Sequence, residues 1–392
     1  MRALLFERSL PRYAAARLAG SLGAGLGSRV APLSLANIDE PDLPGPGWHR
    51  VRPRLSGICG SDVATVDGKS SPFFEPIVSF PFVPGHEVVG DLDDGRRVVL
   101  EPVLACEARG VVPHCGACAA GHTDRCERIV FGHLEPGLQT GYCAATGGGW
   151  STALVAHESQ LHAVPDTMAD EAAVMVEPAA CATHAAMNAG ADGRSVLVLG
   201  AGTLGLCTVA ALRRFATPST LMVAAKHPEQ RRLASELGAD VVVGAGPEEV
   251  RRAVRRATSS LCVGDGLSGG ADVVIDCVGS QASLADDLAV ARPGGTVVML
   301  GMPGNVAVDL TPLWQRQIEL RGSYAYGTET LAGHPSRTFA LAQDLVAEAS
   351  LERLVSATYP LDRYRDAIDH AANAGRRGAV KVAFDLRRER RR

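Results

Sequence analysis

The sequence has no long hydrophobic run and no excess of positive charge. No uninterrupted apolar stretch reaches the roughly 18 residues of a membrane-spanning helix, which argues against a transmembrane protein. The N-terminus, MRALLFERSL, lacks the apolar segment and small-residue cleavage site of a signal peptide, so we expect a cytoplasmic protein. A formal net charge of −4 and a pI near 6.3 argue against nucleic acid or a membrane surface as a partner. The basic run at residues 387–392 is interrupted by Glu389, and we expect it to be a solvated, frayed tail.

The chain has 392 residues, which is enough for two domains because single hydrophobic cores stop growing near 250–300 residues. The first 160 or so residues combine short apolar runs, such as 97–104 and 151–160, with Gly- and Pro-rich turns. This pattern predicts an irregular all-β domain. Residues 14–35 are rich in Ala and Gly and poorly patterned, so we interpret them as an insertion.

The pattern changes after Val164 to helices that alternate with short apolar runs. Residues 166–190 predict one or two helices, and 203–215 and 228–239 predict two more. Strands are expected at 195–200, 221–226, 271–279 and 294–304, and a last strand at 379–386. This alternation predicts a doubly wound parallel sheet, that is, an α/β fold.

Four cysteines lie close together in the spacing C-x8-C-x2-C-x7-C: Cys106, Cys115, Cys118 and Cys126. Thiolates are soft ligands that suit Zn²⁺, so the quartet predicts a closed, structural zinc site. Two disulfides or unpaired thiols are the alternative, and they are disfavoured without an oxidising compartment.

A glycine-rich turn follows the strand at 195–200 and opens the helix at 203–215. In Gly200-Ala201-Gly202-Thr203-Leu204-Gly205, Gly200 permits the tight turn and Gly202 lets the backbone approach a pyrophosphate. Gly205 allows the helix to pack closely, and the helix N-terminus faces the phosphates. The context predicts a dinucleotide-binding fold.

The end of the second strand indicates which dinucleotide binds. NAD-binding domains place an Asp or Glu there for the ribose 2′-hydroxyl, whereas this chain has Ala225 followed by Lys226, His227 and Arg231. A missing carboxylate with nearby cations suits the 2′-phosphate of NADP. Lysine is scarce in the chain, which makes Lys226 more suggestive. We favour NADP(H) over NAD(H), although these charges could simply begin a solvated helix.

Three further motifs surround the quartet: Cys59-Gly60-Ser61-Asp62, Gly85-His86-Glu87 and Glu177-Pro178. Together with the quartet and the glycine-rich turn, they closely resemble the zinc-dependent medium-chain alcohol/polyol dehydrogenase family, in its sorbitol and threonine dehydrogenase-like branch. The resemblance covers nearly the whole chain apart from 14–35 and the basic tail. It implies a GroES-like, β-rich catalytic domain at 1–180 and 324–392, and a Rossmann domain at 181–323.

The resemblance also implies a catalytic zinc and its ligands. They would be drawn from Cys59, His86, Glu87 and Glu177, not all bound at once, because catalysis needs an open position. Ser61 would accept the substrate proton, and Asp62 would orient His86. Hydride would then pass between substrate and nicotinamide. Lys381 matches a basic residue that contacts the cofactor pyrophosphate in relatives, and Val278 is assigned to the cofactor site as well.

Three departures from the family pattern leave details open. The position five after Cys59, often a relay histidine in relatives, is Ala64, so proton release needs water or another group, or the enzyme runs mainly as a reductase. The insertion between Cys106 and Cys115 makes His114 a competing ligand. The long Gly-rich loop 131–149 could shape the substrate pocket.

We therefore expect a zinc-dependent enzyme that transfers hydride between NADP(H) and a secondary alcohol or polyol, or the matching ketone or aldehyde. One alternative is a reductase of an activated C=C or C=N bond, with zinc mainly structural. Another is a non-catalytic zinc- and NADPH-binding redox sensor. A homodimer or homotetramer acting on a small molecule is implied by the family, and the sequence does not identify the substrate.

Overall fold

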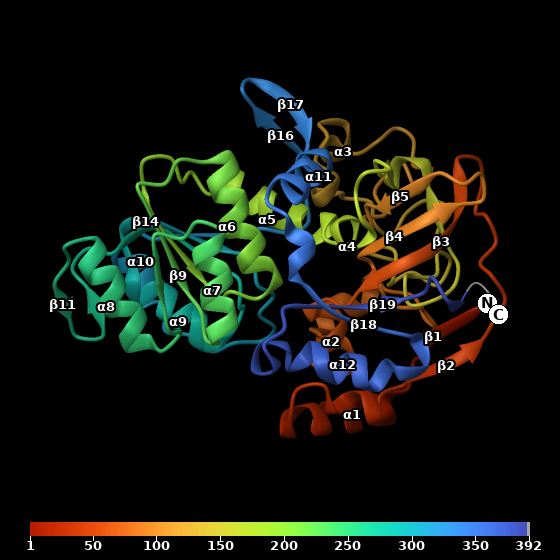
Figure 1. Ribbon diagram of the computed structural model, residues 1–392, viewed down its shortest axis with the longest axis horizontal. Coiled ribbons are helices and arrows are strands. Elements are labelled where there is room, and N and C mark those ends of the chain that lie inside the picture. The colour runs from red at the N-terminus through yellow and green to blue at the C-terminus, as the bar shows by residue number, and fades with distance from the viewer. Residues whose placement is uncertain (390–392) are drawn as a thin grey trace. The chain divides into compact units, whose positions relative to one another are not determined.

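The computed structural model describes residues 1–389, and the last three residues of the predicted basic tail lie outside this part. The chain divides into two compact units (Figure 1). Unit 1 consists of Met1–Glu177, Tyr326–Thr328 and Ser350–Arg392, and unit 2 of Pro178–Ala325 and Glu329–Ala349. No helix in residues 1–389 is both long enough and apolar enough to cross a membrane.

Unit 2 contains a six-stranded, all-parallel sheet in the order β10-β9-β8-β13-β14-β15. Its strands are β8 (Ser195–Leu199), β9 (Thr220–Ala224), β10 (Val241–Val243), β13 (Ala271–Asp276), β14 (Ala291–Met299) and β15 (Glu319–Gly322). Its helices are α5 (Val176–Asn188, which begins in unit 1), α6 (Thr203–Phe215), α7 (Pro228–Glu236), α8 (Pro247–Ala257), α9 (Gln281–Val290), α10 (Thr311–Gln315) and α11 (Thr338–Glu348). It also contains the small hairpin β11–β12 (Cys262–Val263, Gly266–Leu267) and the hairpin β16–β17 (Thr328–Leu331, His334–Arg337), of which only Thr328 belongs to unit 1. The predicted doubly wound sheet is confirmed.

Buried aliphatic side chains on the strands and on α8 and α9 form the core of unit 2, among them Leu197, Met222 and Val274. The strands are nearly continuous apolar runs because both faces of a parallel sheet are covered by helices. The strand order reverses between β8 and β13, and a dinucleotide binds at such a switch point.

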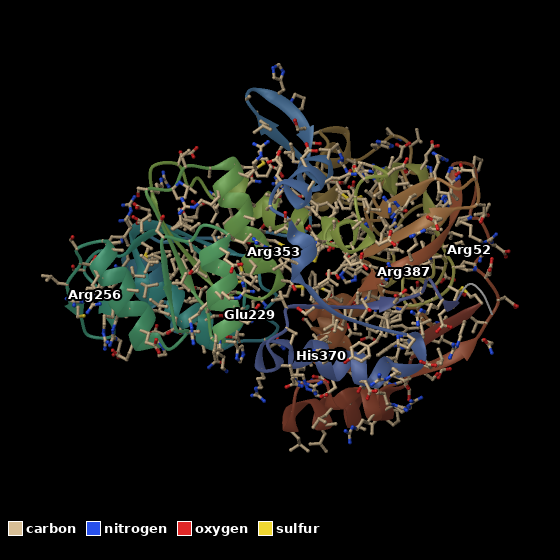
Figure 2. The ribbon with its side chains drawn as sticks, in the orientation of Figure 1. Arg52, Glu229, Arg256, Arg353, His370 and Arg387 are labelled. Carbon is tan, nitrogen blue, oxygen red and sulfur yellow. The ribbon has the colours of Figure 1, made fainter. Side chains whose placement is uncertain are left out.

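Unit 1 is built on a sheet in the order β18-β19-β3-β4-β5-β7, with β6 also paired to β3. Its strands are β3 (Trp48–Gly57), β4 (Val88–Leu92), β5 (Arg97–Leu100), β6 (Leu154–His157), β7 (Leu161–Ala163), β18 (Val355–Tyr359) and β19 (Lys381–Asp385), and a separate ribbon pairs β1 (Arg2–Phe6) with β2 (Leu33–Asn37). Its helices are α1 (Leu10–Leu22), α2 (Gly60–Val66), α3 (Gly116–Ala119), α4 (Asp170–Ala173) and α12 (Tyr364–Ala372). On α12, Nδ1 of His370 (labelled in Figure 2) lies 2.9 Å from the Tyr359 hydroxyl of β18.

The prediction of an all-β first domain is wrong for α1 and α2. Residues 14–35, interpreted as a poorly patterned insertion, contain most of α1 and the first three residues of β2. Ala16 and Gly20 of α1 are buried, while Leu18 and Leu22 are exposed. The apolar periodicity was hidden because small residues face the protein and leucines face outward, which is the reverse of an ordinary amphipathic helix.

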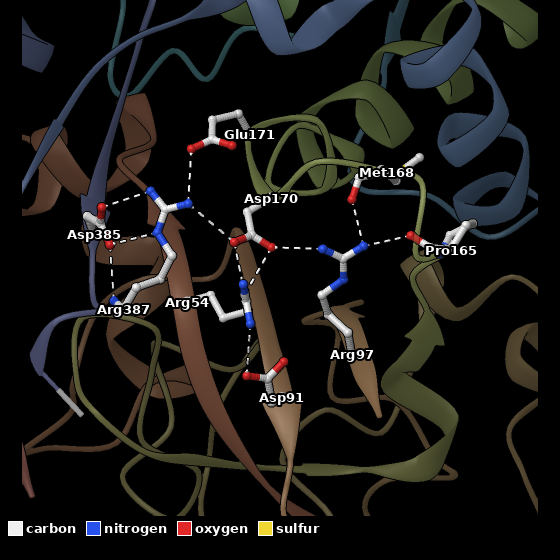
Figure 3. Close-up of polar contacts among 9 residues, drawn as sticks. All are labelled: Arg54, Asp91, Arg97, Pro165, Met168, Asp170, Glu171, Asp385 and Arg387. Carbon is white, nitrogen blue, oxygen red and sulfur yellow. Dashed lines mark hydrogen bonds and ion pairs between the residues drawn. The ribbon is translucent and has the colours of Figure 1, made fainter. Parts of the chain in front are cut away.

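Asp170, the first residue of α4, joins three distant parts of unit 1 (Figure 3). Its carboxylate accepts hydrogen bonds from Arg54 of β3 (2.9 and 3.0 Å), Arg97 of β5 (3.1 Å) and Arg387 after β19 (3.3 Å). Asp170 is only 4% exposed, so these charge-assisted bonds are weakly screened. The expectation of a frayed tail is therefore wrong at Arg387, because three cations around one buried carboxylate hold the segment in place.

Candidate metal and dinucleotide sites

Cys59, His86 and Glu87 come together in unit 1. Each offers one ligand atom, and these atoms all lie within 4.8 Å of one another. Cys59 immediately precedes α2, and the other two residues immediately precede β4. His86 and Glu87 are 4% and 1% exposed. A thiol, an imidazole and a carboxylate around one buried point are a donor set that suits Zn²⁺ and leaves a fourth position open.

Asp62 organises the residues around this cluster. Its Oδ2 accepts a hydrogen bond from the Cys59 backbone N–H (2.9 Å), and its Oδ1 lies 3.5 Å from His86 Nδ1. Burial lowers the pKa of His86, but the Asp62 carboxylate and the Cys59 side chain together raise it well above its usual value. A metal ligand must be a neutral imidazole, so metal binding at this cluster would release a proton.

Lys381 contacts the cluster as well. Its ammonium group is 2% exposed, forms an ion pair with Glu87 Oε2 and donates a hydrogen bond to the Ile58 carbonyl (3.3 Å). Burial lowers the pKa of Lys381, but Glu87, Cys59 and Glu177 together raise it above its usual value, so the lysine stays charged. The sequence predicted that Lys381 contacts a cofactor pyrophosphate. In the structure its ammonium group pairs with the Glu87 carboxylate.

Glu177 is the fourth predicted ligand; it is not part of the compact group of Cys59, His86 and Glu87, but it interacts electrostatically with His86 and Glu87. It is 8% exposed, and its Oε1 accepts a hydrogen bond from the Tyr326 hydroxyl (3.1 Å). Burial raises the pKa of Glu177 to about 7, with Glu87 adding to the rise while His86 and Lys381 oppose it. Tyr326 has no motif around it that would have revealed this contact.

The four cysteines of the quartet also come together, with one ligand atom from each within 4.8 Å of the others. The sulfurs of Cys106 and Cys126 are 3.7 Å apart, and all four thiols are free. Tetrahedral zinc with bonds of about 2.3 Å places its sulfur ligands roughly 3.8 Å apart, so the geometry fits zinc and not a disulfide.

Backbone N–H groups support the thiolates of the quartet. The Cys106 sulfur accepts from the Cys115 N–H (3.4 Å), and the Cys126 sulfur accepts from the Arg128 N–H (3.4 Å). Burial raises the pKa of Cys115, but N–H donors lower it to about 6. His114, the competing ligand considered from the sequence, pairs instead with Glu107 (2.9 Å).

Arg109 lies within the insertion between Cys106 and Cys115 and was not singled out from the sequence. Its guanidinium is fully buried and donates hydrogen bonds of 2.6–3.3 Å to five backbone carbonyls. These belong to Leu104, Phe131, Leu134, Glu135 and Gly137. Burial lowers the pKa of Arg109, while the thiols of Cys143, Cys126 and Cys106 raise it. Arg109 therefore fixes the start of the loop 131–149.

The glycine-rich turn of unit 2 has the backbone that phosphate binding requires. Gly200 has φ +94°, which favours glycine, and a Cβ on Gly205 would overlap the Gly200 carbonyl. Gly202 and the first residues of α6, Thr203 and Leu204, are not buried, so the N–H groups at this helix start are accessible. Val278, just after β13, lies against Gly200 and is 49% exposed.

The end of β9 carries cations and no carboxylate. Arg231 donates from Nη1 to the carbonyls of Ala225 (3.2 Å) and Lys226 (3.3 Å), which brings its guanidinium beside the strand end. Lys226 is exposed, and His227 precedes the first residue of α7. The residues predicted to select the cofactor therefore lie together just after the end of β9: Ala225, Lys226, His227 and Arg231.

Comparisons with known proteins cover both units. Residues 45–166 match the alcohol dehydrogenase GroES-like domain, and residues 203–340 match the zinc-binding dehydrogenase family. The sorbitol dehydrogenase of Arabidopsis thaliana is 28% identical, over 94% of this chain and 99% of that protein. A probable D-xylulose reductase A of Arthroderma otae is 32% identical, over 71% of this chain and 75% of that protein.

Two solved structures have the same fold and contain different nicotinamide cofactors. A protein from Sinorhizobium meliloti described as a zinc-binding dehydrogenase, bound to NADP, is 26% identical with a TM-score of 0.68, over 90% of this chain and 96% of that one. The acetophenone reductase of Geotrichum candidum, in complex with NAD, is 20% identical with a TM-score of 0.71, over 99% of this chain and 98% of that one. The likeness therefore does not decide between NADP and NAD.

Proposed function

Because the chain belongs to the zinc-dependent medium-chain alcohol and polyol dehydrogenases, and is therefore an oxidoreductase with a GroES-like and a Rossmann fold, we propose that it interconverts secondary alcohols or polyols and their ketones. The observation that carries the proposal is the buried cluster of Cys59, His86 and Glu87, within 4.8 Å of one another. Three protein ligands are the usual number at a catalytic zinc site, which keeps its fourth position for water or substrate.

We assign a role to each polar side chain at this cluster. Zinc held by Cys59, His86 and one glutamate would polarise a substrate oxygen, and the bound dinucleotide would exchange hydride with the substrate. Glu87 completes the compact triad, so we propose that Glu177 would bind zinc only when substrate or water does not. Asp62 holds His86 in its orientation, and Ser61 exchanges a proton with the substrate hydroxyl.

The electrostatics are consistent with these roles. Lys381 offsets the charge of Glu87, which would otherwise add a second anion to the Cys59 thiolate. Glu177, with a pKa raised to about 7 by burial, can be either neutral or charged near neutral pH. A carboxyl group whose pKa lies near neutral pH can bind to a metal ion or leave it without a large electrostatic cost.

The reading as a C=C or C=N reductase with zinc mainly structural is not favoured. The two relatives compared above are named for sorbitol, a polyol, and D-xylulose, a keto sugar, and the Cys59 cluster would have no role in a reductase whose zinc is mainly structural. The hypothesis of a non-catalytic redox sensor is not favoured either, because both matched families are dehydrogenase families.

The proposal is tested by zinc content and turnover together. We expect two zinc ions per purified chain, of which Cys59→Ala removes one and abolishes oxidation of polyols and secondary alcohols. Cys118→Ala should remove the other, and Cys262→Ser, which changes an exposed cysteine outside both clusters, should remove neither. A single zinc that survives Cys59→Ala would contradict the proposal.

For the cofactor we propose NADP(H), because Arg231 and Lys226 stand where a carboxylate would bind the NAD ribose. Charged hydrogen bonds contribute about 1.5–3 kcal/mol, so Arg231→Ala should raise the KM for NADP⁺ roughly tenfold or more and leave that for NAD⁺ unchanged. Arg232→Ala is the matched control, since Arg232 pairs with Glu229 and Glu236. An equal rise in the KM values for NADP⁺ and NAD⁺ would contradict the proposed preference for NADP(H).

We further propose a homodimer or homotetramer in the cytoplasm. The edge strand β15 is exposed at all four residues, and an exposed edge can pair with a second copy. The ten free cysteines suit a reducing compartment. Light scattering at micromolar concentration would measure the assembly, and a monomer would contradict that part of the proposal.

A further inference from the structure

We propose that the cysteine quartet positions Glu177 through Tyr326. The quartet segment, residues 116–125, holds the backbone of Tyr326, and the Tyr326 hydroxyl restrains the Glu177 carboxylate. This inference rests on the proposed function and adds a positioning residue to it. It also gives the quartet a role beyond folding its own loop.

Tyr326 restrains Glu177 by a direct hydrogen bond. The tyrosine is 1% exposed, and its hydroxyl donates to Glu177 Oε1 (3.1 Å). Glu177 is outside the compact group of Cys59, His86 and Glu87, so it must move before it can share a metal ion with them. Bulk water does not replace a buried donor, so a carboxylate that turns away loses a charge-assisted hydrogen bond. Tyr326 therefore disfavours the conformation in which Glu177 would compete with substrate.

The quartet segment contacts Tyr326 and the two residues that follow it. Thr123 Oγ1 donates a hydrogen bond to the Tyr326 carbonyl (3.4 Å). Gly327 packs so closely that a Cβ on it would lie 3.0 Å from the Gly121 carbonyl oxygen. A Cβ on Gly121 would in turn lie 2.6 Å from Thr328 Oγ1. The backbone that carries the Tyr326 side chain is therefore packed directly on the quartet segment.

The backbone at Tyr326 depends on such support. The preceding residue, Ala325, has φ +50°, a left-handed conformation that a residue with a Cβ rarely adopts. A conformation of this kind persists only where the surrounding contacts impose it. We therefore expect the backbone around Tyr326 to relax, and its hydroxyl to move, when the quartet segment unfolds.

The quartet segment has little apolar core of its own. No residue is buried in α3 or in the 3₁₀ turn Thr123–Arg125. The apolar cluster at this place is made largely of the quartet cysteines themselves: Cys106, Val111 and Cys115 are buried, and Ala117, Cys118 and Cys126 are partly buried. Structural zinc sites contribute folding energy directly. The conformation of the quartet segment therefore depends on its metal site, and so does the position of Tyr326.

The first test is Tyr326→Phe, which removes only the hydroxyl. We expect the KM for the alcohol to rise about tenfold and kcat to change less than about threefold, because a released Glu177 competes with substrate. Zinc content should stay the same. Tyr359→Phe is the matched control and should change neither constant, since that hydroxyl pairs with His370 outside both metal clusters. An active Tyr326→Phe variant with an unchanged KM would overturn the positioning role.

A second measurement does not depend on turnover. Co²⁺ in place of zinc gives a visible absorption spectrum that reports the number and geometry of its ligands. Tyr326→Phe should shift this spectrum in the absence of substrate, and adding Glu177→Ala to that variant should abolish the shift. A spectrum that is identical in wild type and Tyr326→Phe would overturn the inference.

The link to the quartet is tested by Cys118→Ala. Hydrogen–deuterium exchange at residues 326–328 should become faster, the KM should rise as in Tyr326→Phe, and the two changes together should do no more than one alone. Thr123→Val keeps all four cysteines and should act in the same direction, which covers a Cys118→Ala protein that does not fold. Unchanged exchange at 326–328 in Thr123→Val would overturn the link. A wild type that binds zinc and cofactor yet turns over neither alcohols nor ketones would overturn the proposed function, while the exchange and the Co²⁺ spectra would still decide the coupling.

Discussion

Asp287 on α9 is a buried carboxyl group with an unusual environment. Both of its oxygens are buried and accept no hydrogen bond from residues 1–389, whereas nearby Asp276 accepts three, from the N–H groups of Val278 and Gly279 and from the Ser283 hydroxyl. Burial, with the Asp276 charge adding to it, raises the pKa of Asp287 well above its usual value. The folded state therefore favours the protonated form.

This predicts a pH-dependent effect of Asp287→Asn. A raised pKa gives stability that is present below the usual carboxyl pKa and is lost as pH rises through the raised value. The free-energy advantage of the variant over wild type should therefore grow by up to about 1.4 kcal/mol per pH unit above pH 4. Urea unfolding between pH 4 and 8 measures it. Asp286→Asn, which changes a partly exposed neighbour, is the control and should change the pH dependence of the unfolding free energy less. If the unfolding free energies of Asp287→Asn and wild type ran parallel between pH 4 and 8, the prediction would be wrong.

Single residues also mark the limit of sequence reasoning at the site. Cys59, His86 and the cysteine quartet were recognisable because a motif or a short spacing identifies a ligand set. Lys381, Tyr326 and Arg109 act through partners far away in the chain, and a lone lysine, tyrosine or arginine has no local pattern that identifies a buried role. Their positions depend on strand pairing and loop packing, which only the folded chain specifies.

At the scale of elements, the alternation of strands and helices in unit 2 was predictable because each strand is a short apolar run bounded by turn residues. The helix α1 was not, because its buried face is made of Ala and Gly. The loop 131–149 was recognised as long and Gly-rich, but its conformation depends on Arg109, which donates to carbonyls at both ends of the segment 131–137.

Arg109→Lys should therefore loosen this loop. Lysine keeps the charge but cannot reach five carbonyls with a single ammonium group, so buried acceptors lose their partners at a cost of about 1–3 kcal/mol each. Hydrogen–deuterium exchange should rise at 131–138, and the melting temperature of unit 1 should fall. Arg125→Lys is the control, since its side chain is 62% exposed and, among residues 1–389, pairs only with neighbouring Asp124. Equal exchange in both variants would contradict this role for Arg109.

At the scale of the whole molecule, both metal sites belong to unit 1 and the dinucleotide turn belongs to unit 2. Zinc binding can contribute on the order of 10 kcal/mol to folding in small domains. A strong chelator should therefore lower the melting temperature of unit 1 by well over 10 °C, whereas NADPH should raise that of unit 2. Differential scanning calorimetry separates the two transitions, and a chelator that shifted only the unit 2 transition would contradict the assignment.

Unit 1 is assembled from segments at opposite ends of the sequence, and this has a consequence for synthesis. The hydrogen bond between Lys381 and Ile58 joins residues 323 positions apart, and β19 pairs with β3. During translation, every strand of the unit 2 sheet leaves the ribosome before Lys381 does, so that sheet can form first. Glu87 gains its buried counter-charge only when β19 emerges. A nascent chain released before that point would carry the ligands of both metal sites but lack the strand that completes the first of them.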